Sequence, residues 1–123
     1  MKKTRNNIQR LQDILGQIDF IESYTNIEED EFYRNEVLKL AVLKSLEIIG
    51  EAASQITKDI RTNYPDMDWD KMITARNYYV HEYFSVDWNW LWQSVKKYID
   101  FGKIKKYCSF IIEQLDKEMN NAP

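Results

Sequence analysis

The chain has 123 residues, of which 44% are hydrophobic and 14% aromatic, and its formal net charge is −3. This length and hydrophobic content suit one folded domain over residues 1–123 and exclude an intrinsically disordered chain. No apolar run approaches the ~20 residues of a membrane span, and polar residues interrupt the basic N-terminus where a signal peptide would be apolar. We therefore expect a cytoplasmic protein. Three glycines and two prolines are too few for a β-rich fold of this size, which predicts long helices.

The first half of the chain predicts two helices. Apolar residues at three- and four-residue spacing, from Ile8 to Ile21, predict an amphipathic helix over residues 4–24. The acidic residues 28–31 suit the first turn of a second helix, where carboxylates meet the positive end of the helix dipole. We expect this helix to run over residues 29–62. It is apolar on more than one side at residues 40–50, as in a central helix with several neighbours.

The second half predicts two or three more helices. Pro65 ends the preceding element, and Asp66 or Asp68 can cap a third helix that carries residues 75–84. Ser85 and Asp87 precede a fourth helix over residues 87–100. Gly102 is the expected break before a fifth helix, whose apolar positions are Ile104, Tyr107, Cys108, Ile111, Ile112 and Leu115. The sequence therefore predicts an all-α bundle of four or five helices.

Charge is distributed unevenly along the chain. Residues 11–70 hold five basic and fourteen acidic side chains, whereas residues 71–106 hold seven basic and three acidic ones. The negative net charge of the whole chain argues against indiscriminate binding of nucleic acid, because affinity for phosphates depends on local cations. The basic segment leaves two interpretations, a local phosphate site or lysines on a solvated face, and the second is the more common.

The chain offers few groups for metal or nucleophilic chemistry. Its one cysteine, Cys108, cannot form an internal disulfide and suits a reducing compartment. Cys108 sits in an apolar helical pattern, so we expect it in the core rather than in catalysis. With one histidine and no dense pattern of carboxylates we expect no metal, and without a glycine-rich phosphate loop we expect no cofactor.

The chemistry-bearing pattern is ARNYYVHEYF, residues 75–84, which contains the one histidine. Arg76 is a forked donor suited to a phosphate, and His81 is a natural acid or base near neutral pH. At ~100° per residue, Arg76 and Tyr83 lie within ~20° of each other around a helix, but His81 is rotated by ~140° from Arg76. One straight helix does not aim all three at one atom. Two solutions are open: the long side chains can converge in part from the flank of a helix end, or a two-fold dimer can join two such helices. This geometric problem is the main reason to expect a homodimer.

Less specific interpretations remain open. A histidine near an arginine in a helical protein most often serves packing or a surface hydrogen bond. Tyr78, Tyr79 and Phe84 are most simply core or interface aromatics. Trp88, Trp90 and Trp92 alternate, so they spread over more than one helix face, and some could serve an interface. Glu51 is a candidate buried acid to which the sequence assigns no role.

Residues 76–83, RNYYVHEY, resemble the Arg-x4-His-x-Tyr signature of the HepT-like branch of the HEPN superfamily. The resemblance extends to LEIIGEAASQI (46–56), to the pair Pro65 and Trp69, and to YFSVDWNWLW (83–92). It implies a helical homodimer that cleaves RNA without a metal, as the toxin of a type VII-like two-gene module. The implied partner is an MntA-type nucleotidyltransferase antitoxin.

The same resemblance implies a role for four residues. His81 is the acid/base group, Arg76 stabilises charge on the phosphate, and Asn77 orients the site. Tyr83 matches the tyrosine that the antitoxin modifies with AMP. Two alternatives stay open: a non-catalytic nucleotide- or protein-binding subunit of a nucleotidyltransferase complex, and a purely structural dimerising bundle.

Overall fold

The computed structural model describes residues 2–81 and 85–121, and the side chains of residues 77–81 are not described. Within these ranges the chain is helical and contains no strand. The elements are α1 (Lys2–Tyr24), α2 (Glu29–Arg34), α3 (Glu36–Gln55), α4 (Lys58–Asn63), α5 (Trp69–His81), α6 (Trp88–Gln93), a π-helical turn (Ser94–Tyr98) and α7 (Phe101–Asn120). The predicted all-α class is therefore confirmed.

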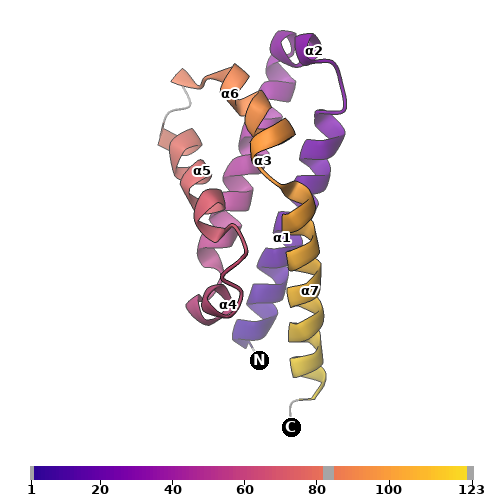
Figure 1. The fold of residues 1–123 in the computed structure, drawn as a ribbon, viewed down its shortest axis with the longest axis vertical. Coiled ribbons are helices and arrows are strands. Elements are labelled where there is room, and N and C mark those ends of the chain that lie inside the picture. Colours follow the sequence, from indigo (N-terminus) through magenta and orange to yellow (C-terminus); the bar gives the residue numbers. More distant parts are fainter. Residues whose placement is uncertain (1, 82–84, 122–123) are drawn as a thin grey trace.

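The longest helices of the described chain, α1, α3, α5 and α7, form the body of the molecule (Figure 1). The helix α3 packs against both α5 and α1, and α1 also packs against α7. The short helices α2, α4 and α6 lie toward the ends of this bundle, and both termini lie at its lower end in the view. Because α3 contacts neighbours on two sides, it buries residues around its axis, as its apolar pattern predicted: Val42, Leu43, Leu46, Ile49, Ala52 and Ala53.

The first predicted helix is confirmed almost to its ends, since α1 covers residues 2–24. Its core face carries Leu11, Ile14, Ile18 and Ile21, which are fully buried. Burial of such side chains contributes about 1.5–3 kcal/mol each, so this one face anchors α1 to α3 and α7.

The predicted single helix over residues 29–62 is wrong, because the chain breaks twice within it. Asn35 takes an extended conformation, and its side chain accepts a hydrogen bond from Leu38 N at 3.0 Å, which begins α3. The second break lies at residues 56–57. There Thr57 N donates to Asn7 Oδ1 at 3.1 Å, and Asn7 Nδ2 donates to Thr57 Oγ1 at 2.8 Å. The first of these bonds compensates the Thr57 N–H, which has left the helical ladder, and the second ties the Thr57 side chain to α1.

The predicted helix over residues 87–100 is nearly correct in extent, because α6 and the π-helical turn run without a break over residues 88–98, but its second half is not an α-helix. Asp87 caps α6 by accepting from Trp90 N at 3.1 Å. The segment then widens into the π-helical turn, which closes with Ile99 N donating to Ser94 O at 2.8 Å. The next helix starts after Asp100, whose side chain accepts from Lys103 N at 3.0 Å. Gly102 lies inside α7, so its predicted role as a break is wrong.

The three tryptophans near α6 point in different directions, as their alternation predicted. Trp92 is buried, with its ring centroid 4.9 Å from that of Phe32. Trp88 is half-buried beneath the Lys39 ammonium, and Trp90 is 43% exposed. None of the helices in the described part of the chain has the length and apolar character to cross a membrane.

Candidate functional site

Arg76 and His81 lie on the same helix, α5, of which His81 is the last residue. Five residues along a helix correspond to a rise of ~7.5 Å and a rotation of ~140°, so the backbone positions of the two residues lie at different angles around the axis of α5. The side chains of Asn77 and His81 are outside the description, and Tyr83 lies outside the described residues. Their placement around one phosphate therefore stays a prediction.

The Arg76 side chain contacts α3 through an ion pair with Glu51. Arg76 Nη1 donates to Glu51 Oε2, and the two side chains are 27% and 53% exposed. The expectation that Glu51 is buried is therefore wrong, because its carboxylate lies at the surface. The hydrogen bond from Arg76 lowers the pKa of Glu51 below its usual value, and Gln55 Nε2 donates to the other carboxylate oxygen at 3.3 Å. Glu51 is thus ionised at neutral pH.

Gly50 brings α3 and α5 together at this point. A Cβ added to Gly50 would overlap the Arg76 Cβ and would lie 2.7 Å from the Met72 carbonyl oxygen and 3.0 Å from Arg76 Cγ. A glycine is required here by the closeness of the neighbouring helix, since its backbone is ordinary helix with a negative φ. The GEA segment of the sequence therefore has a structural explanation, because Gly50 lies against the Arg76 Cβ and Cγ and Glu51 pairs with the Arg76 guanidinium.

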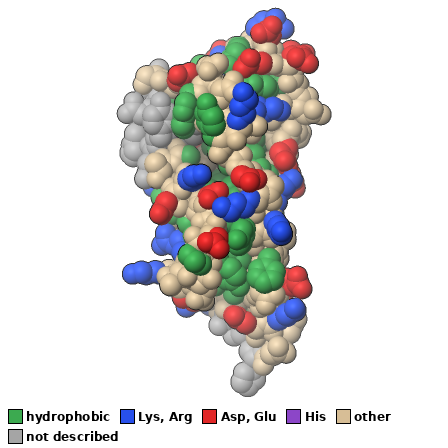
Figure 2. All heavy atoms as spheres, in the orientation of Figure 1, with side chains coloured by type: hydrophobic (Ala, Val, Ile, Leu, Met, Phe, Trp, Pro, Cys, Tyr) green, Lys and Arg blue, Asp and Glu red, His purple; other side chains and the backbone are tan. Residues whose placement is uncertain are grey.

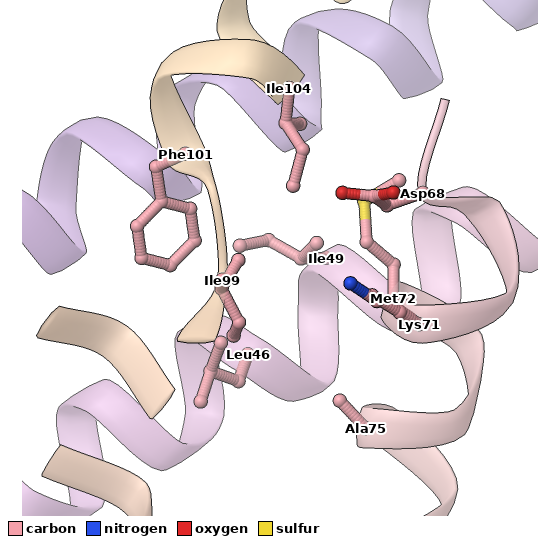
Figure 3. A pocket seen from close by; sticks show the side chains of 9 residues that line it. All are labelled: Leu46, Ile49, Asp68, Lys71, Met72, Ala75, Ile99, Phe101 and Ile104. Carbon is pink, nitrogen blue, oxygen red and sulfur yellow. The ribbon is translucent and has the colours of Figure 1, made fainter. Parts of the chain in front are cut away.

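A small cavity lies beside α5, but it is no substrate site. It is lined mainly by apolar side chains of α3, α5 and α7, including Ile49, Met72 and Ile104 (Figure 3). Its volume of about 20 Å³ is enough for one water molecule and far below the ~300 Å³ at which ligand pockets begin. It is a packing gap between helices.

Two open grooves border the motif helix and its partner. One is lined by Lys71 and Thr74 of α5 together with Trp90 and Tyr98. The other lies between α1 and α3, and its lining includes Arg10, Glu51 and Gln55. The Glu51 end of the ion pair therefore opens to solvent, where a ligand can reach it.

Three lysines of the basic segment over residues 71–106 contact oxygen acceptors of the same chain. Lys103 Nζ lies 3.2 Å from Asp68 Oδ1, Lys105 Nζ lies 2.7 Å from Glu22 Oε1, and Lys96 Nζ donates to Thr25 O at 2.9 Å. Figure 2 shows basic and acidic side chains interspersed on the face that it presents. These three lysines are thus held by acceptors of the fold.

Cys108 is fully buried, and burial raises the pKa of its thiol to about 12. A thiol in this environment is neither a nucleophile nor a metal ligand at neutral pH, so its predicted place in the core is confirmed. Among the side chains that the structure describes, no group of three His, Cys, Asp or Glu could hold a metal ion.

Sequence reasoning missed the contact between Arg76 and Glu51. Glu51 and Arg76 are 25 residues apart and on different helices, so no helical spacing joins them. The one available signal was the isolated glycine inside a helical pattern, because such a glycine often marks a close approach of another backbone.

Comparisons with known proteins identify the family. Residues 14–111 match the family model described as "Ribonuclease HepT-like". A relative named "Putative RNase" from Methanocaldococcus jannaschii is 42% identical over 102 residues, which cover 82% of this chain and 92% of the relative. A relative named "Probable ribonuclease HepT" from Thermococcus cleftensis is 36% identical over 105 residues, which cover 83% of this chain and 96% of the relative. No solved structure was found to match. Since the family model spans most of the chain, including the whole motif, the chain belongs to the HepT-like ribonuclease family.

Proposed function

We propose that this protein is a metal-independent RNA endonuclease of the cytoplasm and that Arg76, His81 and Asn77 form its site. The observation that carries the proposal is the family match over residues 14–111, which contains the complete motif. The position of Arg76 supports it, because the structure holds this guanidinium at the surface rather than in the core.

The reaction needs no external nucleophile, because RNA supplies its own 2′-hydroxyl. A neutral His81 takes the proton of this hydroxyl while the 2′ oxygen bonds to phosphorus. The bond from phosphorus to the 5′ oxygen breaks, and a protonated histidine gives its proton to that oxygen. The products are a 2′,3′-cyclic phosphate and a 5′-hydroxyl. Arg76 stabilises the negative charge that develops on the phosphate, and Asn77 orients the group through hydrogen bonds.

We further propose a two-fold homodimer in which two motif helices share one cleft. The acid and the base of the reaction are then His81 and the partner subunit's His81. The ~140° between the positions of Arg76 and His81 along α5 supports this arrangement, because one straight helix does not aim both residues at one atom.

The proposed biological role is that of a toxin whose partner is an MntA-type nucleotidyltransferase antitoxin. The Tyr83 hydroxyl loses its proton to solvent, and its oxygen bonds to the α-phosphorus of ATP. The bond from the α-phosphorus to the oxygen that bridges it to the β-phosphorus breaks, so pyrophosphate leaves and AMP stays on Tyr83. The added phosphate brings negative charge and bulk two residues from His81, which blocks the approach of RNA.

The decisive experiment is RNA cleavage in EDTA by the wild type, His81→Ala and Arg76→Ala. The exposed Arg34 at the end of α2 provides the matched control, Arg34→Ala, for loss of a positive charge elsewhere. We expect cleavage by the wild type and by Arg34→Ala, and a loss of roughly 10²-fold or more in both motif variants. Equal activity of the wild type and His81→Ala would remove His81 from catalysis. Calorimetry that detects ATP binding without RNA turnover would instead favour the non-catalytic nucleotide-binding subunit.

A further inference from the structure

We propose that Glu51 is a positioning residue for Arg76, holding the guanidinium in the orientation in which it meets the RNA phosphate. This inference rests on the proposed ribonuclease function and adds to it a residue outside the motif. The family signature consists of residues of α5 and the segment after it, whereas Glu51 belongs to α3.

Two consecutive residues of α3 fix the two ends of the Arg76 side chain. At the root, Gly50 leaves only enough space for the Arg76 Cβ and Cγ. At the tip, Glu51 Oε2 accepts from Nη1. An arginine side chain has several rotatable bonds, and it loses much of its rotamer freedom when both ends are held. The phosphate then meets a guanidinium that is already oriented.

Glu51 is itself held in place. Gln55, one turn further along α3, donates to Glu51 Oε1 at 3.3 Å, so each carboxylate oxygen has a partner. Glu51 and Gln55 also line the groove between α1 and α3 with Arg10. The carboxylate is thus oriented by its own helix before it orients Arg76.

Stability alone is a weak reason for this ion pair. Both side chains are partly exposed, and pairs of this kind contribute little to folding because water and salt screen them. If Glu51 positions Arg76, removing Glu51 should lower the rate of RNA cleavage strongly while changing the free energy of unfolding little.

The test compares Glu51→Ala and Glu51→Gln with the matched control Glu47→Ala. Glu47 lies one turn earlier on α3 and pairs with Lys44 at 3.6 Å, so its removal also deletes an acid and an ion pair from this helix. We expect Glu51→Ala to lower kcat by about 10- to 100-fold. Its KM should stay unchanged or fall, because a negative charge near the substrate phosphate is removed. Glu51→Gln keeps an acceptor oxygen and should recover most of kcat, and Glu47→Ala should match the wild type.

Two outcomes would overturn the inference. One is a Glu51→Ala variant with the kcat of the wild type. The other is a Glu51→Ala, Arg76→Ala double variant that is about 10-fold or more slower than Arg76→Ala alone, because a positioning residue has no effect once its target is removed.

A measurement without RNA separates this inference from the proposed function. In the wild type and in Glu47→Ala, the Arg76 Nε–Hε signal in nitrogen-15 NMR should be that of an immobilised guanidinium, and Glu51→Ala should shift it toward the range of a mobile one. If the wild type cleaves no RNA but shows this pattern, the proposed function fails and the positioning of Arg76 by Glu51 stands. If the signal is the same in all three proteins, Glu51 does not hold Arg76.

Discussion

Replacing Gly50 by alanine tests the close approach of α3 and α5 on which the site depends. The new Cβ would overlap the Arg76 Cβ and would lie 2.7 Å from the Met72 carbonyl oxygen, well inside the ~3.5 Å of a favourable contact. Neither neighbour is the end of a flexible side chain, so the two helices must move apart. Overpacking of this kind costs about 1–3 kcal/mol, and we expect the upper end because backbone has to shift.

Gly16 provides the control for the helix propensity of alanine. It lies inside α1, and an added Cβ has no atom within 4 Å. Alanine is favoured over glycine in a helix interior by about 1 kcal/mol at both sites. Gly16→Ala should therefore stabilise the protein by up to about 1 kcal/mol. Gly50→Ala should destabilise it by about 2 kcal/mol after the same propensity gain is subtracted.

The assay is urea unfolding of both variants and the wild type at equal protein concentration, since the stability of the proposed homodimer would depend on concentration. The two variants should differ by about 3 kcal/mol, which corresponds to roughly 10 °C in Tm for a chain of this length. If Gly50→Ala is as stable as Gly16→Ala, the two helices have more space than the structure shows, and the explanation of the GEA segment is refuted.

Three further predictions concern groups away from the site. Asn7→Ala should lower the free energy of unfolding by about 1–3 kcal/mol in urea, because it leaves the Thr57 backbone N–H without its acceptor, and an unchanged value would contradict that pairing. The Cys108 thiol should resist a thiol reagent at pH 8 until the protein is unfolded, since burial raises its pKa to about 12, and fast reaction of the native protein would show that it is accessible. Hydrogen bonds from Thr57 and Lys3 lower the pKa of Asp59 to about 2 from 3.8, so its stabilising effect is complete above pH 3.8 and is lost as the pH falls toward 2. Asp59→Asn should therefore make the pH dependence of unfolding shallower between pH 4 and pH 2, and identical slopes would contradict this.

The parts of the fold that follow from one helix's own sequence could be predicted. The apolar residues of α1 recur along its whole length, so its helical periodicity could be recognised in the sequence. Asp87 directly precedes the apolar start of α6, so this cap could be recognised as well. Cys108 could be assigned to the core because its neighbours Ile104 and Ile111 share one helix face.

The parts that depend on tertiary contacts could not be predicted. The break at residues 56–57 is stabilised by Asn7, which lies 50 residues away in sequence from Thr57. The π-helical turn after α6 has no turn residue that marks it. The same reason hid the Glu51 partner of Arg76: a polar side chain is assigned to the surface or the core only when its neighbours on other helices are known.

The most direct test of the central claim is the dependence of cleavage on the 2′-hydroxyl of the RNA. After the cleavage positions of one RNA are mapped in EDTA, the same RNA is synthesised with a single 2′-deoxy nucleotide on the 5′ side of one cleaved bond. If His81 activates the 2′-hydroxyl, that bond should remain intact while the other positions are cut and carry 2′,3′-cyclic phosphate ends. Cleavage at the deoxy position, or ends with a 3′-hydroxyl and a 5′-phosphate, would show that water is the nucleophile and would contradict the account.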